Sequence, residues 1–138
     1  MAKTPRQAST ERPTGLPGLP GLNLKPFDVV VVPFPFTDQN ASKRRPALVL
    51  SSAAFGRAVE HSVLAMITSA EQSSWPGDLA IVQLESTGLT LPCLIRLKLF
   101  TLDHRLIVRR SGELSAADRQ RLQTAWEPWW VLGTRQSE

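Results

Sequence analysis

Hydrophobic positions in this chain form short runs separated by polar turns, a pattern typical of β-strands. The first run, residues 29–36, is β-branched and aromatic, and Pro33 and Pro35 restrict its end to a sheet edge or a bend. The polar residues 37–44 contain turn formers without an apolar period and predict a long loop. A second apolar run then predicts a strand over residues 46–51.

Four further strands are predicted downstream, over residues 62–68, 78–82, 94–100 and 106–110. The run 94–100 alternates from Ile95 onward, so Arg96 and Lys98 are expected to form a basic row on the outer face of a half-buried strand. Short strands at this spacing predict a small β-barrel.

A helix is predicted after the strands. Ser115 and Asp118 form a capping-box-like start, in which the serine oxygen accepts from backbone N–H groups and the aspartate complements the positive end of the helix. Pro128 should end or kink the helix at Glu127. An apolar stripe with the helical period is expected to pack on the barrel and contains Leu122, Ala125, Trp126, Trp129 and Trp130.

The domain organisation follows from composition. A chain of 138 residues with 42% hydrophobic residues fits one globular core. Residues 1–26 contain five prolines and three glycines without helical or strand period, which predicts a flexible tail. We therefore expect a tail over 1–26, a folded domain over 27–133 and a short C-terminal tail over 134–138.

The net charge of +4 argues less for nucleic acid than its size suggests. Residues 1–26 hold four of the 16 basic side chains and one of the 12 acidic ones, so residues 27–138 hold 12 basic and 11 acidic groups, a net of +1. What counts is clustering, and the basic runs of the folded part are 43–45 and 109–110.

Several classes of site are excluded by residue counts. One cysteine, Cys93, excludes an internal disulfide, and His61 and His104 alone do not make a metal site, so neither metal nor cofactor is expected. No apolar run approaches the roughly 18 residues of a membrane helix, and the charged start lacks the apolar stretch of a signal peptide. We expect a cytoplasmic protein without a membrane partner.

The residues themselves resemble a known family. The stretches 27–38, 42–51, 67–69, 96–103 and 112–115 are similar, in this order, to the MazF/PemK family of toxin endoribonucleases from type II toxin–antitoxin systems. The resemblance covers about residues 27–127. It implies a mainly β (α+β) fold, an SH3-like partly open β-barrel with a C-terminal α-helix, as in MazF and CcdB. It also implies a homodimer that cleaves single-stranded RNA (mRNA) without metal and is inhibited by a cognate antitoxin.

The resemblance also assigns site residues. The arginine before the proline of the second strand is Arg45, and the hydroxyl residue that closes the third strand is Thr68, so these two are the expected catalytic pair. RNA contacts are expected from four further residues, Lys43, Arg44, Thr37 and Ser69. The chain departs from many relatives at Cys93 and Leu97, so the base preference is not carried over.

The residue types suit the chemistry. In RNA the 2′-hydroxyl can attack the adjacent phosphorus, and charge then grows on the non-bridging oxygens. The guanidinium of Arg45 is always charged, and its planar fork matches phosphate oxygens. The Thr68 hydroxyl can donate to a phosphate oxygen or hold the attacking 2′-hydroxyl. Arginines in polar loops and threonines in strands are common without any function, so it is the resemblance that raises this pair above that default.

Other groups are weaker candidates. His61 and His104 could serve a two-histidine ribonuclease, but His61 lies before a predicted strand and His104 in a predicted turn, and exposed turn histidines are more often solvated than catalytic. Cys93 has no visible partner base, and a buried structural thiol is the commoner case. The late tryptophans could stack on bases, but their helical spacing favours the core.

Two alternative functions stay open. A relative of the same fold poisons DNA gyrase by binding it through a C-terminal tryptophan, so a non-catalytic protein-binding toxin is an alternative, favoured by Trp129 and Trp130 and disfavoured by Arg45 and Thr68. A non-catalytic RNA-binding protein is the other, given the departures at Cys93 and Leu97.

Overall fold

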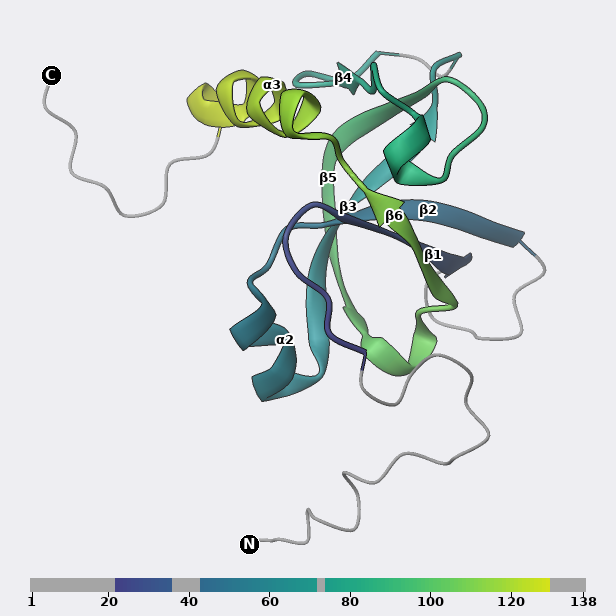
Figure 1. Cartoon of the computed structure of the whole chain (residues 1–138), viewed down its shortest axis with the longest axis vertical. Coiled ribbons are helices and arrows are strands. Elements are labelled where there is room, and N and C mark those ends of the chain that lie inside the picture. The colour runs from purple at the N-terminus through teal and green to yellow at the C-terminus, as the bar shows by residue number, and fades with distance from the viewer. Residues whose placement is uncertain (1–21, 36–42, 72–73, 130–138) are drawn as a thin grey trace, which may run out of the picture.

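The main element of the fold is one antiparallel sheet with the strand order β4-β5-β3-β2-β1-β6 (Figure 1). The computed structural model describes residues 22–35, 43–71 and 74–129. Its strands are β1 (Asp28–Phe34), β2 (Lys43–Val49), β3 (His61–Ser69), β4 (Leu79–Ala80), β5 (Cys93–Asp103) and β6 (Arg109–Glu113). Its helices are α2 (Ala53–Val59) and α3 (Ala116–Trp126), with short 3-10 turns at Glu85–Thr87, His104–Leu106 and Glu127–Trp129.

The sheet curls into a half-barrel because two strand pairs cross. Figure 1 shows β1 and β2 running across the direction of β3 and β5. The β1–β2 register spans six residue pairs and the β3–β5 register nine, whereas β2 and β3 are joined by only three pairs, Ala47–Met66 to Val49–Leu64. The predicted mainly β, partly open barrel with a C-terminal helix is confirmed.

Both faces of the sheet are apolar, because strands such as β1 contain continuous apolar runs and successive residues of a strand point to opposite faces. One face, called the helix face below, packs against α3 and contains Val29, Leu48, Ala65, Leu122 and Trp126. The other, called the entry face, is covered by residues 22–26, called the incoming chain, and by the turn before β6. It contains Leu24, Val30, Ala47, Leu64 and Ile107.

The proline in β1 sits where no neighbour needs its missing N–H. The Val108 N–H donates to the Val31 carbonyl (2.8 Å), so Val31 directs its backbone groups toward β6, and so does Pro33 two residues later. The β1–β6 register ends at Val31–Arg109. Pro33 therefore faces an edge of β1 that β6 no longer covers, as predicted.

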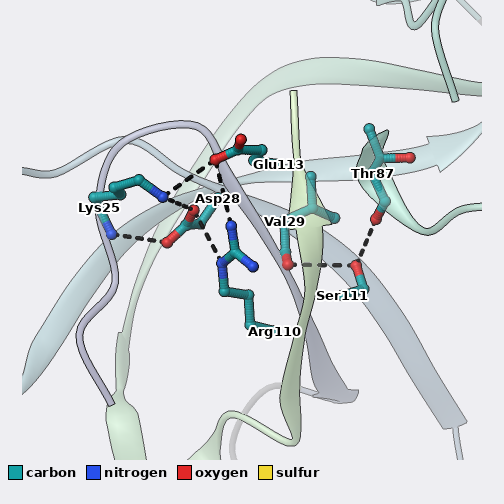
Figure 2. Close-up of polar contacts among 7 residues, drawn as sticks. All are labelled: Lys25, Asp28, Val29, Thr87, Arg110, Ser111 and Glu113. Atoms are coloured by element: carbon teal, nitrogen blue, oxygen red, sulfur yellow. Dashed lines mark hydrogen bonds and ion pairs between the residues drawn. The ribbon is translucent and has the colours of Figure 1, made fainter. Parts of the chain in front are cut away.

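The incoming chain is tied to β1 and β6 by a charged cluster (Figure 2). The Asp28 side chain is 1% exposed and accepts from the backbone N–H and the Nζ of Lys25, both at 2.9 Å. Arg110 Nε lies 3.1 Å from the same carboxylate, and Glu113 contacts both cations. Leu24, 2% exposed, belongs to the core, so residues 22–26 pack on the domain, although the sequence placed them in the tail. Residues 1–21 and 134–138 lie outside the described residues.

Several predicted strand boundaries are wrong. β2 begins at Lys43, so the basic run 43–45 lies in a strand rather than in the predicted loop. β4 contains two residues instead of five, and β6 begins at Arg109 because residues 104–106 form a 3-10 turn. In β5 the register with β3 shifts, because Ala65 lies opposite Leu99 and the next residue, Met66, lies opposite Arg96.

Of the two helices, the sequence predicts α3 but not α2. Ser115 caps α3 as predicted, accepting from the Asp118 N–H at 3.0 Å. The buried Asp118 carboxylate, however, accepts from the N–H groups of Val82 and Gln83 and so fixes the chain after β4. α2 was not predicted. Leu122 and Trp126 pack on the sheet, whereas Trp129 is 56% exposed and does not continue the stripe; Trp130 lies outside the described residues.

Candidate functional site

The β2–β3 register ends at Ala47–Met66, beyond which the two strands diverge (Figure 1), and this opening is called the fork below. One arm is the N-terminal half of β2, which stays paired with β1 as far as Phe34–Lys43. The other is the end of β3, which stays paired with β5 as far as Ser69–Cys93. The two expected catalytic residues lie on different arms, each two residues beyond the last pair.

Arg45 and Thr68 share the entry face. Side chains two apart in a strand point to the same side, so Arg45 follows Ala47 and Thr68 follows Met66, and the paired Ala47 and Met66 share a face. Each residue is about 7 Å along its strand from that pair. The fork therefore presents both residues on one side of the sheet.

Arg45 is held by an aromatic ring. Its guanidinium carbon lies 4.7 Å from the centroid of the Phe34 ring, within the range of a cation–π contact. The side chain is partly exposed rather than free in a loop. A charged group in this position contacts a neutral ring and still reaches solution.

Thr68 is more enclosed. The Thr68 residue is 7% exposed, and its cross-strand partner on β5 is Leu94. Most of the side chain is therefore packed, and only its edge meets the entry side of the fork. A direct role in chemistry is less accessible for Thr68 than for Arg45.

The four expected RNA-binding residues do not form one cluster. Lys43 shares the entry face with Arg45, while Arg44 and Ser69 point to the opposite side, because strand neighbours alternate. The Ser69 hydroxyl accepts from the Glu71 N–H at 3.2 Å. Thr37 lies outside the described residues.

A second charged group on this face was only partly visible in the sequence. Arg96 lies opposite Met66 on β5, and it is 9% exposed rather than part of an open basic row, because two of its nitrogens contact the Asp78 carboxylate at 3.0 and 2.9 Å. The alternation of apolar and basic residues in β5 indicates Arg96 in the sequence. Its partner Asp78 is 18 residues away, and no sequence pattern near either residue predicts the pair.

Trp75 lies beside this ion pair. It is 40% exposed, and its indole N–H donates to the Leu97 carbonyl at 3.2 Å. The cations of Arg96 and Lys98 lie 5.7 and 5.2 Å from its ring centroid. An exposed indole held by a hydrogen bond, with two cations near its ring, is a surface on which a nucleobase can stack.

The histidines do not form a catalytic pair at the fork. His104 is 3% exposed and hydrogen-bonded to the Ser62 hydroxyl at 2.8 Å, so the expectation of a solvated turn histidine is wrong for it. His61 begins β3, seven residues and thus about 23 Å of strand before Thr68. The geometry therefore gives no support to a two-histidine site.

Cys93 is disfavoured as a nucleophile by its surroundings. Burial raises the pKa of the thiol, and Sγ lies 3.2 Å from the Leu91 carbonyl oxygen. A raised pKa leaves little thiolate near neutral pH, and the thiolate is the reactive form.

Within residues 22–35, 43–71 and 74–129, no three histidine, cysteine or acidic side chains converge to hold a metal ion. No helix in that part of the chain is long and apolar enough to cross a membrane.

Comparison with known proteins gives a consistent assignment. The family model described as PemK-like, MazF-like toxin of type II toxin-antitoxin system matches residues 25–127, which is most of the chain. No curated protein sequence matches this chain significantly.

Solved structures share the fold at low identity. A MazE–MazF complex from Deinococcus radiodurans (Form-II) has a TM-score of 0.58 at 19% identity and covers 77% of this chain and 93% of its own. A mycobacterial endoribonuclease in complex with its cognate antitoxin also has a TM-score of 0.58 at 19% identity and covers 74% and 89%. The Mycobacterium tuberculosis toxin MazF-mt6 has a TM-score of 0.56 at 18% identity and covers 71% and 90%. With the family model matching about three quarters of its length, this chain belongs to the PemK-like, MazF-like toxins of type II toxin–antitoxin systems.

Proposed function

We propose that this toxin is a metal-independent endoribonuclease that cleaves single-stranded RNA at the fork. The observation that carries the proposal is the position of Arg45: its guanidinium is stacked on Phe34 and faces the same side of the open sheet as Thr68. Support also comes from two solved structures of similar fold that are described as mycobacterial endoribonucleases.

The reaction uses the substrate's own hydroxyl. The 2′-oxygen forms a bond to the adjacent phosphorus and loses its proton, and the bond from phosphorus to the 5′-oxygen breaks. Water takes the proton from the 2′-oxygen and supplies one to the departing 5′-oxygen, so the products are a 2′,3′-cyclic phosphate and a 5′-hydroxyl. Arg45 stabilises the negative charge that grows on the non-bridging oxygens, because two of its N–H groups can reach two oxygens at once.

Thr68 is assigned a positioning contact at the other arm. Its hydroxyl can donate to a phosphate oxygen at the edge of the packed side chain. Lys43, on the same face, binds a flanking phosphate, and Trp75 offers a stacking surface to a neighbouring base. Arg44 and Ser69 face the other side, so they can contact RNA only where it bends around the strand ends.

The partners follow from the same reading. We propose a cytoplasmic homodimer inhibited by a cognate antitoxin, consistent with relatives whose structures contain MazE and MazF together. An antitoxin segment that covers the fork would exclude RNA from Arg45.

One experiment tests the catalytic proposal. Purified protein is incubated with single-stranded RNA in excess EDTA, beside the Arg45→Ala variant prepared in the same way. We expect cleavage by the unaltered protein alone. Cleavage that needs added Mg²⁺, or that persists in the variant preparation, would contradict the proposal and indicate a metal-dependent or contaminating nuclease.

The alternative of a non-catalytic, gyrase-binding toxin has one observation in its favour, the 56% exposure of Trp129 near the end of the described chain. It predicts inhibition of DNA supercoiling by purified gyrase, lost in a Trp129→Ala variant. Inhibition without RNA cleavage would favour this alternative.

A further inference from the structure

The direction of the backbone groups of β2 explains why the fork opens where it does. Leu50 donates its N–H to the Val63 carbonyl at 2.8 Å, and the register continues through Leu48–Ala65. In an antiparallel pair every second residue faces the same neighbour. Even-numbered residues of β2 therefore direct their N–H and C=O groups toward β3, and the next one is Pro46.

Pro46 offers β3 a carbonyl but no N–H. Continuing the register would place it opposite Ile67 in a hydrogen-bonded pair, which needs donors on both residues. The following pair, Arg45 with Thr68, also depends on the missing N–H of Pro46, because a non-hydrogen-bonded pair is held by the bonds of the pairs on either side of it. The observed β2–β3 register stops one step before, at Ala47–Met66.

The other side of β2 is a control within the same strand. Pro46 pairs there with Val31, which directs its own backbone groups to β6, as its bond from the Val108 N–H shows. The β1–β2 ladder thus loses nothing at the proline and runs on to Phe34–Lys43. β2 continues as a strand, and only its pairing with β3 ends.

We infer that Pro46 is a positioning residue that holds the two arms of the fork apart, so that a ribose–phosphate can enter between Arg45 and Thr68. This inference rests on the proposed cleavage at that place. With a donor at position 46 the ladder would extend, and Arg45 and Thr68 would become a direct cross-strand pair with Cβ atoms roughly 5 Å apart. Such a pair leaves no space for the substrate between the two side chains.

The test compares two variants that differ in one N–H group. In Pro46→Ala the residue gains a donor. The second variant carries lactic acid at position 46, which has the same methyl group but an ester oxygen in place of the N–H. Pro33→Ala serves as a control, because it removes a strand proline whose missing N–H faces away from β2.

We expect Pro46→Ala to lower kcat for RNA cleavage by about 100-fold, as for a displacement of roughly 1 Å in the reacting groups. KM should change far less, since Lys43 and Trp75 stay in place. The ester variant and Pro33→Ala should cleave at nearly the unaltered rate. In Pro46→Ala the new amide at position 46 should exchange with solvent as slowly as its paired neighbours in β2.

Three results would overturn the inference: full activity in Pro46→Ala, loss of activity in the ester variant, or rapid exchange of the new amide. If Pro46→Ala fails to fold, the ester variant decides alone. A folded but inactive ester variant would overturn the inference, and an active one would support it. The exchange measurement needs no RNA, so it tests the structural inference independently of the proposed function. An unaltered protein that does not cleave RNA would contradict the proposed function instead.

Discussion

The two basic runs of the folded domain differ in what their charges contact. In β6, Arg110 lies against the buried Asp28 carboxylate and Glu113, and with Lys25 this cluster joins three segments of chain (Figure 2). In β2, no ion pair of Lys43 or Arg45 is found within the described residues, and Arg45 contacts a neutral ring instead. Similar sequence runs thus serve different ends: charge that meets acid groups fixes the fold, and charge left toward solution is available to an anion.

The largest effect is expected at Arg45. Arg45→Ala should lower RNA cleavage by roughly three orders of magnitude, because the developing phosphate charge loses its bidentate donor. The unfolding free energy should change by no more than about 1 kcal/mol, since a partly exposed stacking contact contributes little. Cleavage rates and urea unfolding of the same preparations measure both. A variant with more than a tenth of the unaltered rate would remove Arg45 from the mechanism.

A smaller loss is expected at Thr68. Thr68→Ala should reduce cleavage by about tenfold to a hundredfold, the effect of losing one neutral donor near the phosphate. Thr68→Ser keeps the hydroxyl and serves as its matched control, with activity close to the unaltered rate. Equal rates for the alanine and serine variants would reduce Thr68 to a packing role.

The reverse outcome is expected in β6. Arg110→Ala leaves the buried Asp28 carboxylate with Lys25 as its remaining cation, so the free energy of unfolding should fall by about 1–2 kcal/mol, a range reduced for the partial exposure of Arg110. RNA cleavage per folded molecule should not change. Loss of cleavage without loss of stability would show that the two basic runs do not divide their roles as described.

The smallest effect is expected from the N-terminal tail. Deletion of residues 1–21 removes three basic side chains and one acidic one, so thermal unfolding should be unchanged while the salt dependence of RNA affinity becomes shallower. Leu24→Ala is the contrasting variant: Leu24 is 2% exposed, and we expect a loss of about 2–4 kcal/mol in unfolding free energy. A truncated protein that fails to fold would move the domain boundary toward the N-terminus.

The sequence was informative wherever structure depends on local pattern. The period of two located the main strands, and the spacing of Ser115 and Asp118 located the start of α3. The polar residues 37–44 predict a loop because they contain turn formers without an apolar period, whereas β2 already begins at Lys43. α2 was missed because seven residues with a central glycine give no clear helical period.

The site was less predictable because it depends on contacts between distant residues. The hydrogen bond of His104 to Ser62 spans 42 positions, and the ion pair of Arg96 with Asp78 spans 18. The fork depends on which neighbour Pro46 faces, and a sequence gives no strand order. The roles of Arg45 and Thr68 stay predictions, although the structure puts the two on one face.

The central claim is that the RNA 2′-hydroxyl is the nucleophile, and one substitution in the substrate tests it directly. A single-stranded oligonucleotide with a 2′-deoxy residue immediately 5′ of the scissile bond is compared with its all-RNA counterpart, with both binding and product ends measured in EDTA. We predict no cleavage at the deoxy position, binding within roughly tenfold because phosphate and stacking contacts remain, and 2′,3′-cyclic phosphate ends from the all-RNA substrate. Cleavage at the deoxy position would show that water attacks the phosphorus, and would contradict the mechanism proposed for Arg45 and Thr68.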